Sequence, residues 1–136
     1  MSNISTADPL TGLLNRNAFD EEFKIQMQAA AEGNLPISLA FLDIDNFLLI
    51  NKSFGHIGGD QVLKSISAIL RDQAGKQAIT SRYGGDEFAL IFPNMEREQA
   101  FLTMERIRSQ VESQDRFGEV HSRITITGGI AAYPID

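Results

Sequence analysis

The stretch Arg82-Tyr83-Gly84-Gly85-Asp86-Glu87-Phe88 carries the strongest signal in this chain for both fold and chemistry. An apolar run follows it, so residues 87–92 are predicted to form a strand and residues 83–86 a tight hairpin turn. Glycines tolerate the positive φ that such a turn can demand, and they leave room for a ligand to approach the backbone. The hairpin is therefore expected to present two carboxylates beside space for a ligand.

A second acidic segment, Asp43-Ile44-Asp45, ends the apolar run of residues 37–43. Because Asp43 and Asp45 are two residues apart, both point to the same face of an extended strand. Acidic residues at the end of a strand are often merely solvated, and Asp45 could instead cap the helical turn that begins at Asn46. The pair by itself leaves these alternatives and a metal site open.

The hairpin carboxylates, Asp86 and Glu87, favour the metal alternative. Three or four carboxylates converging on one sheet edge would repel one another unless a cation lay between them. A donor set of oxygens without histidine or cysteine favours Mg²⁺, with substrate phosphates completing the octahedron, and Mn²⁺ is a second candidate. This combination points to nucleotide chemistry.

The segment from Asn51 to Asp60 has two interpretations. Asp60 could be the N-cap of the helix predicted over residues 60–71. Alternatively, its carboxylate could accept hydrogen bonds from N1–H and the exocyclic amine of guanine, with Asn51 alongside, which would favour guanine over adenine.

Apolar periodicity predicts the order helix, strand, helix, hairpin, helix, strand. We expect helices at 17–32, 60–71 and 96–113, a helical turn at 46–52, a glycine-bearing loop at 54–59, and strands at 37–43, 78–82, 87–92 and 123–131. Gly33 is the expected stop of the first helix. After the leading helix the order is βαββαβ, an α+β sandwich in which helices cover one face of a largely antiparallel sheet.

Composition narrows the class of protein. The chain has 136 residues, 43% of them hydrophobic, which suits one domain with a real core. A net charge of -6 argues against broad binding of nucleic acid or anionic membranes. The absence of cysteine excludes disulfides and thiolate–zinc sites, and no apolar run is long enough for a membrane span, so a cytoplasmic location is expected.

Several ordered motifs resemble the GGDEF domain, the catalytic domain of bacterial diguanylate cyclases. The match extends from Asp8 to Pro134. Its motifs are Asp8-Pro9-Leu10-Thr11-Gly12-Leu13-Leu14-Asn15-Arg16, Asp43-Ile44-Asp45-Asn46-Phe47, Asn51, Phe54-Gly55-His56, Gly59-Asp60, the stretch from Arg82 to Phe88, and Ile124-Thr125-Ile126-Thr127-Gly128-Gly129-Ile130-Ala131.

The resemblance implies a nucleotidyl-cyclase-like palm, a ferredoxin-like sandwich, and a two-metal reaction. Such enzymes join two GTP molecules into cyclic di-GMP with loss of two pyrophosphates, and the active site forms where two subunits of a homodimer face each other. Asp43 and Asp86 would be the metal carboxylates, assisted by the Ile44 carbonyl and Glu87, with Asp43, Asp86 and Glu87 as the catalytic set. The substrate-binding residues would be Asn51 and Asp60 on guanine, Gly84 and Gly85 beside the triphosphate, and Phe47.

Three departures from the family pattern support an alternative. The family commonly has Lys and Asp where this chain has Leu48 and Lys52, which removes one expected phosphate contact. Residues 75–78 lack the RxxD product-inhibition motif. The chain also stops before the family's last helix and strand, and no sensor or receiver domain precedes Asp8. We therefore expect a single GGDEF domain over residues 1–136, truncated at its C-terminus. The alternative is a degenerate domain that binds GTP as a regulatory or dimerisation module.

Overall fold

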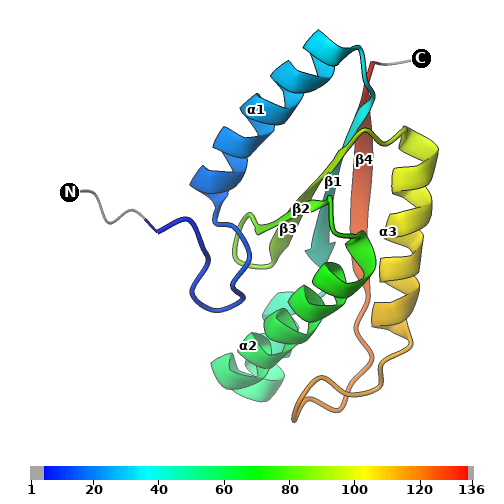
Figure 1. Cartoon of the computed structure of the whole chain (residues 1–136). Coiled ribbons are helices and arrows are strands. Elements are labelled where there is room, and N and C mark those ends of the chain that lie inside the picture. The colour runs from blue at the N-terminus through cyan, green and yellow to red at the C-terminus, as the bar shows by residue number, and fades with distance from the viewer. Residues whose placement is uncertain (1–4, 135–136) are drawn as a thin grey trace.

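The computed structural model describes residues 5–134, so the chain ends lie outside the description. Its elements follow the predicted order (Figure 1), which confirms βαββαβ after a leading helix. The helices are α1 (Arg16–Gly33), α2 (Phe47–Ala74) and α3 (Arg97–Glu112), and the strands are β1 (Ile37–Ile44), β2 (Ile79–Arg82), β3 (Glu87–Pro93) and β4 (Ile126–Tyr133).

The four strands form one antiparallel sheet in the order β2-β3-β1-β4. Strand β1 lies in the interior, pairing with β3 on one side and with β4 on the other. Strands β2 and β3 form the predicted hairpin. The sheet is that of an α+β sandwich, as the sequence predicts, and it agrees with the palm that the resemblance implies.

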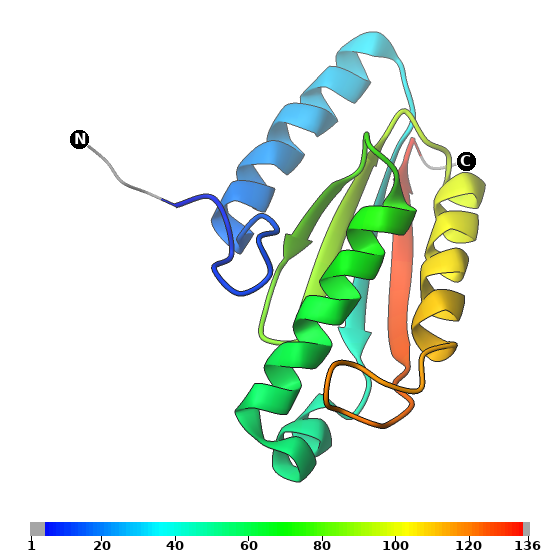
Figure 2. The same ribbon diagram turned by 60° about the horizontal axis from the view of Figure 1, so that its bottom comes forward.

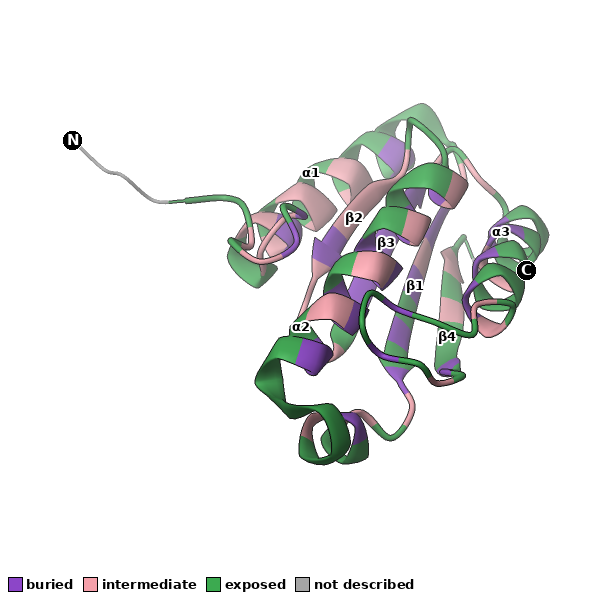
Figure 3. Ribbon diagram, turned by 90° about the horizontal axis from the view of Figure 1, so that it is seen from below, coloured by how far each residue is buried: buried purple, intermediate pink, exposed green. Residues whose placement is uncertain are grey.

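Alternate residues of β1 contribute to two hydrophobic clusters on opposite faces of the sheet, as the period of two in a strand requires. Ala40 and Leu42 pack in the cluster that includes α2 and α3, whereas Ile37 and Leu39 pack with α1. Figures 1 and 3 show the sheet between α1 and the other two helices. The two helices of the βαββαβ unit thus cover one face as expected, and the leading helix covers the other.

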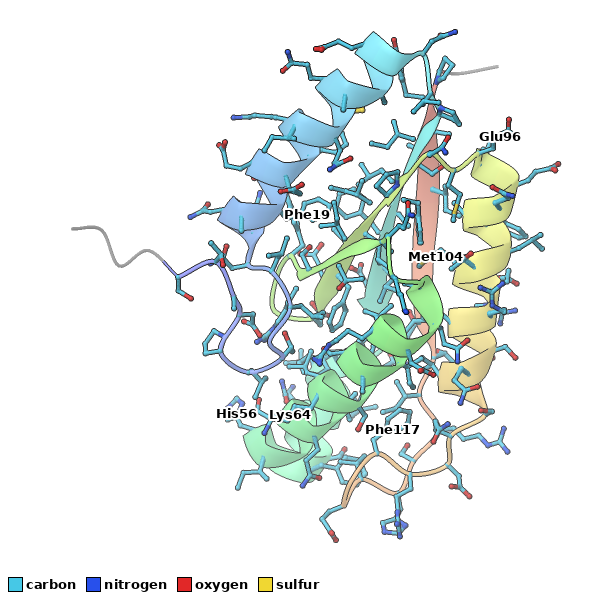
Figure 4. The ribbon with its side chains drawn as sticks, viewed as in Figure 1. Phe19, His56, Lys64, Glu96, Met104 and Phe117 are labelled. Atoms are coloured by element: carbon cyan, nitrogen blue, oxygen red, sulfur yellow. The ribbon has the colours of Figure 1, made fainter. Side chains whose placement is uncertain are left out.

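Helix α1 is capped by an asparagine at each end. The Asn15 side chain accepts a hydrogen bond from the Ala18 N–H at 2.9 Å, and Asn34 adopts the left-handed conformation with φ 53°. The predicted stop at Gly33 is therefore one residue early. Phe19 projects from α1 toward the strands and is buried (Figure 4). Among the described residues, no helix has the length and apolar character to cross a membrane.

The predicted loop over residues 54–59 is wrong, because most of it belongs to α2. The helix is interrupted only at Gly55, with φ 74° and ψ 176°, and Figure 2 shows the resulting bend. Gly58 and Gly59 are buried, and a Cβ built on Gly59 would lie 1.9 Å from Asn51 Oδ1. The paired glycines therefore allow two helical segments to pack closely.

The segment between α3 and β4 folds back against α2. Phe117 and Val120 are buried and exchange two backbone hydrogen bonds of 2.7 and 2.9 Å. Gln61 of α2 accepts a hydrogen bond from the Glu119 N–H at 2.8 Å (Phe117 is labelled in Figure 4). Because β1 ends at Ile44, whose partner on β4 is Ile126, β4 begins at Ile126 and not at position 123 as predicted, and it continues to Tyr133.

Candidate active site

Asp43 and Glu87 are directly opposite each other where β1 and β3 end. The next pair along the ladder is hydrogen bonded, since the Ile44 N–H donates to the Asp86 carbonyl at 3.1 Å. Pairs alternate in an antiparallel ladder, so Asp43 and Glu87 form a non-hydrogen-bonded pair, in which the side chains lie closest. Both residues are exposed. The fold therefore brings two carboxylates from distant segments together at an open end of the sheet.

The two carboxylates lie on the face of the sheet that α1 covers farther along. Asp43 has the same parity in β1 as Leu39, and Glu87 has the same parity in β3 as Ala89 and Ile91, which pack with α1. This face of the sheet is thus apolar under α1 and becomes charged and solvent-accessible at the end that carries the two carboxylates.

Residues 83–86 form the turn between β2 and β3, as predicted. The N–H groups of Tyr83 and Gly84 both donate to the Glu87 carbonyl, at 2.8 and 3.2 Å. The expectation of positive φ in this turn is wrong, since neither Gly84 nor Gly85 is among the residues with positive φ. A Cβ at Gly85 would meet nothing within 4 Å, whereas one at Gly84 would meet Glu87 Oε1 at 2.3 Å. The space beside Gly85 is consistent with the expectation that a glycine here leaves room for a ligand.

Asp45 is held by threonines and does not cap α2. Its carboxylate accepts hydrogen bonds from the Thr125 hydroxyl at 2.6 Å and from the Thr127 hydroxyl at 2.8 and 3.0 Å. The N-cap of α2 is Asn46, with a left-handed backbone and no side-chain cap hydrogen bond. The capping alternative for Asp45 is therefore wrong. This carboxylate ties the end of β1 to the start of β4.

The predicted guanine-binding residues lie on the two segments of α2. Asn51 is in the first segment, against Gly59 of the second, and Phe47 approaches the same glycine, with its Cζ 3.3 Å from a Cβ built there. Asp60 follows Gly59, is exposed and lies inside the helix, so its interpretation as an N-cap is wrong. The packing of the two segments brings Asn51 next to the turn of helix that holds Asp60.

The donors at this end of the sheet are carboxylate and carbonyl oxygens, the ligand type that hard divalent cations take. Within residues 5–134, no group of three or more acidic or histidine side chains is arranged to hold a metal ion by itself. What remains is the opposed pair Asp43 and Glu87, with Asp86 and the Ile44 peptide beside it. Mg²⁺ commonly uses one or two carboxylates and completes its octahedron with water and substrate phosphates.

Arg82 and Asp8 brace the turn, which the sequence interpretation missed. Arg82 Nε and Nη2 donate to the Gly85 carbonyl at 3.1 and 2.8 Å, and Nη1 lies 3.4 Å from Asp8 Oδ1. Asp8 also accepts hydrogen bonds from the Thr11 N–H and hydroxyl at 2.9 and 2.8 Å. The sequence feature that could have indicated this contact is that Asp8 and Arg82 both belong to motifs shared with the GGDEF domain.

The pKa of Asp8 is lowered by this environment. Burial is the largest single influence and by itself raises the pKa. The hydrogen bonds from Thr11, together with the positive charge and hydrogen bond of Arg82, outweigh it. The Asp8 carboxylate is therefore charged at neutral pH and holds the leading segment against the turn.

The leading segment also pairs with the edge of the sheet. The Leu14 N–H donates to the Thr80 carbonyl at 3.2 Å, and the Arg82 N–H donates to the Leu14 carbonyl at 3.0 Å. Leu14 thereby extends the sheet beyond β2 by one parallel bridge. Strand β2, which leads into the turn, is therefore hydrogen bonded along its outer edge by Leu14.

An antiparallel β2-β3-β1-β4 sheet with carboxylates at the ends of β1 and β3 defines a domain of the nucleotidyl-cyclase-like palm class. Residues 5–136 match the family model described as diguanylate cyclase, GGDEF domain. The chain belongs to the GGDEF domain family.

Relatives and solved structures agree with this assignment. The chain is 39% identical over 131 residues to the uncharacterized protein YhcK of Bacillus subtilis (strain 168), covering 93% of this chain and 36% of YhcK. It is 36% identical over 127 residues to the diguanylate cyclase DgcP of Pseudomonas aeruginosa, covering 93% of this chain and 19% of DgcP. The chain thus spans about a third and a fifth of the lengths of these curated relatives.

Among solved structures, the GGDEF domain of DgcB from Caulobacter crescentus in complex with c-di-GMP superposes with a TM-score of 0.88. Its sequence is 38% identical, and the match covers 97% of this chain and 78% of that one. This likeness confirms the predicted fold.

Proposed function

We propose that this domain is a diguanylate cyclase that condenses two GTP molecules into cyclic di-GMP and two pyrophosphates. The observation that carries the proposal is the opposed pair Asp43 and Glu87 at an open sheet end, beside the space at Gly85. Two carboxylates on directly opposed strand positions favour a cation between or beside them, and nucleoside triphosphates are bound as metal complexes. Membership of the GGDEF family supplies the reaction.

Asp43, Asp86 and Glu87, with the Ile44 carbonyl, would hold two Mg²⁺ ions, for which Mn²⁺ could substitute. When bound, the ions would activate the attacking hydroxyl and neutralise charge on the transferring phosphate. Asp43 and Glu87 would supply ligands from adjacent strands, and the backbone bond from Ile44 to Asp86 would keep the turn in register with β1.

Asn51 and Asp60 would bind the guanine base. A carboxylate at Asp60 can accept from N1–H and the exocyclic amine, a pattern that guanine presents and adenine does not. Phe47, packed near Gly59, would support the base-binding end of α2. Gly84 and Gly85 would let the turn approach the triphosphate, since a Cβ at Gly85 has nothing within 4 Å.

The reaction requires two subunits. In each half-reaction the 3′-hydroxyl of one GTP attacks the α-phosphorus of the other, a new P–O bond forms, the bond to pyrophosphate breaks and the hydroxyl loses its proton. One domain binding one GTP cannot complete this exchange, so we propose a homodimer in which two copies face each other.

GTP as the substrate favours a cytoplasmic location. Because the curated relatives are much longer than this chain, we also propose that a sensor or receiver domain partners this one in a longer protein.

Product analysis tests the proposal. The chain is incubated with GTP and Mg²⁺ at a series of protein concentrations, and products are separated by chromatography and identified by mass spectrometry. We expect cyclic di-GMP to form at a rate that rises more steeply than linearly with protein, because a dimer is required. Asp43→Asn and Asp86→Ala should abolish the product while the far-UV circular dichroism spectrum is retained.

A second function, GTP binding without turnover, is favoured by one observation. Leu48, in the first turn of α2, is 69% exposed and occupies a position where the family commonly has a lysine that can contact phosphate. Measurable GTP binding without product at any protein concentration would favour this function over catalysis. Restoration of product by Leu48→Lys would show that the missing cation is the cause.

A further inference from the structure

The ring of Tyr83, the first residue of the signature turn, is enclosed by side chains from α1 and β1. Phe19 contacts it edge-on with ring centroids 5.6 Å apart and planes at 79°, and Phe41 does the same at 5.5 Å and 78°. The Arg16 guanidinium lies over the ring, 4.5 Å from its centroid. Aromatic and cation–π contacts of this kind are individually modest but depend on orientation. The ring is therefore held in one orientation.

The Tyr83 hydroxyl adds a specific polar anchor. It donates to Asp20 Oδ1 of α1 at 3.0 Å, in a partly buried position. The apolar contacts with Phe19 and Phe41 would be equally available to a phenylalanine, so they do not account for the hydroxyl. A hydrogen bond to a carboxylate is stronger than one between neutral groups and fixes how far the ring reaches toward α1.

The backbone of the same residue closes the turn. The Tyr83 N–H donates to the Glu87 carbonyl at 2.8 Å, and the Gly84 N–H donates to the same oxygen at 3.2 Å. Gly84 and Gly85 have no side chains with which to fasten the turn, and the space around Gly85 is open. At its start, the turn is anchored by Arg82, which reaches Asp8, and by Tyr83, which reaches α1.

We propose that Tyr83 and Asp20 are positioning residues, through which α1 holds the signature turn and the Glu87 backbone in the geometry that catalysis needs. This inference rests on the proposed cyclase function and names a determinant of that site outside its ligand-binding residues. Neither residue is expected to touch GTP or metal. The effect passes from the Asp20 carboxylate to the Tyr83 ring, and from the Tyr83 backbone to the Glu87 carbonyl.

Three variants of the full chain test the inference: Tyr83→Phe, Asp20→Ala and the double variant. Each single change should lower kcat for cyclic di-GMP about threefold to tenfold, the range that the loss of one hydrogen bond gives. KM for GTP should stay within about twofold, because the base- and phosphate-binding residues are unchanged. The double variant should match either single one, because both remove the same contact. Glu21→Gln, at the neighbouring exposed position of α1, should leave kcat unchanged.

Amide hydrogen exchange provides a readout that does not need turnover. In Tyr83→Phe and Asp20→Ala, the Tyr83 and Gly84 amides should exchange several-fold faster, while the amides of α2 and α3 and the melting temperature stay close to those of the unchanged chain. Glu21→Gln should leave the exchange of both turn amides as it was.

The two measurements separate failure of the inference from failure of the proposed function. If the unchanged chain makes no cyclic di-GMP but the turn amides respond as described, the cyclase function is lost and the anchoring by α1 stands. If the turn amides and kcat are unaffected by both single variants, the inference is overturned. Additive losses of kcat in the double variant would also overturn the inference, because the two side chains would then act independently of each other. A uniform loss of amide protection over the whole chain would overturn it as well, because the contact would then be merely structural.

Discussion

Asp43 and Glu87 occupy directly opposed positions on β1 and β3, and the neighbouring cross-strand pair, Leu42 and Phe88, is buried. Like charges directly opposite each other weaken a sheet. The buried pair and the backbone ladder hold the strands together at the point where the two carboxylates repel. The end of the sheet thus keeps two like charges on opposed positions, an arrangement that a compensating positive charge favours.

Removing one charge from this pair should stabilise the metal-free fold. Asp43→Asn should raise the free energy of unfolding by about 0.2–1 kcal/mol, the range for cross-strand pairs. The measurement is urea denaturation in EDTA, followed by circular dichroism. Glu21→Gln, whose carboxylate is exposed on α1 with Lys24, is the control and should change little. A less stable Asp43→Asn chain would mean that the carboxylate has a favourable partner.

Binding of Mg²⁺ should stabilise the fold most when both carboxylates, Asp43 and Glu87, are present. At about 100 times its dissociation constant, an ion that binds only the folded chain adds roughly 2.7 kcal/mol to the free energy of unfolding. We expect a rise in the melting temperature of the unchanged chain with Mg²⁺, reversed by EDTA, and a much smaller rise for Asp43→Asn or Glu87→Gln. Equal rises in all three chains would place the ion elsewhere.

Two glycine substitutions should separate packing from ligand access. Gly59→Ala places a Cβ 1.9 Å from Asn51 Oδ1 and should cost about 1–3 kcal/mol of stability, as overpacking does. Gly85→Ala meets nothing within 4 Å and should change stability by less than about 0.5 kcal/mol, yet lower GTP turnover. Thermal denaturation and product formation are measured for both. Full turnover in Gly85→Ala would contradict the approach of this turn to the triphosphate.

Asp60 should control the choice of base. Asp60→Ala removes an exposed carboxylate, so stability should hold, while the preference for GTP over ATP should fall on the order of tenfold or more, as the loss of charged hydrogen bonds implies. Calorimetric dissociation constants for both nucleotides give the ratio. Asp72→Ala, an exposed acidic position of the same helix, should leave it unchanged. An unaltered preference in Asp60→Ala would exclude Asp60 from base recognition.

The Asp8 carboxylate should make the fold sensitive to acid. Its pKa in the folded chain is lowered from 3.8, so the folded chain binds the proton less readily than the unfolded one. The stabilisation is therefore present in full above about pH 5 and is lost as the pH falls through 3.8 and then through the lowered folded-state pKa.

The measurement is the difference in unfolding free energy between the unchanged chain and Asp8→Asn. It should be about 1–3 kcal/mol at pH 7, the cost of breaking hydrogen bonds to a charged group, and should shrink progressively below pH 5. A difference that does not depend on pH would show that the Asp8 charge does not contribute.

Local patterns were sufficient to predict the element order and the hairpin. Apolar periodicity acts over a few residues, and the signature turn lies between two apolar runs, so neither requires knowledge of distant contacts. The same patterns place Asp43 at the end of one strand and Glu87 at the start of another. The motifs also carried the resemblance that the family match confirms.

Some of the errors fall where a residue's partner is remote in the sequence. The sequence left the role of Asp45 open between a helix cap and a metal ligand, because its threonine partners lie 80 and 82 positions away. Gly58 and Gly59 resembled loop residues, since a pair of glycines does not reveal that the helix is interrupted at Gly55 and packs them against Phe54, Asn51 and the distant Val120.

The family, the order of helices and strands, and the residue types at strand ends could be predicted from the amino-acid sequence, because these depend on local spacing. The pairings between distant residues required the three-dimensional fold: Glu87 lies opposite Asp43, Thr125 and Thr127 bind Asp45, and Tyr83 binds Asp20. Strand register and helix placement are set by the burial of both sheet faces at once, which is a property of the whole fold.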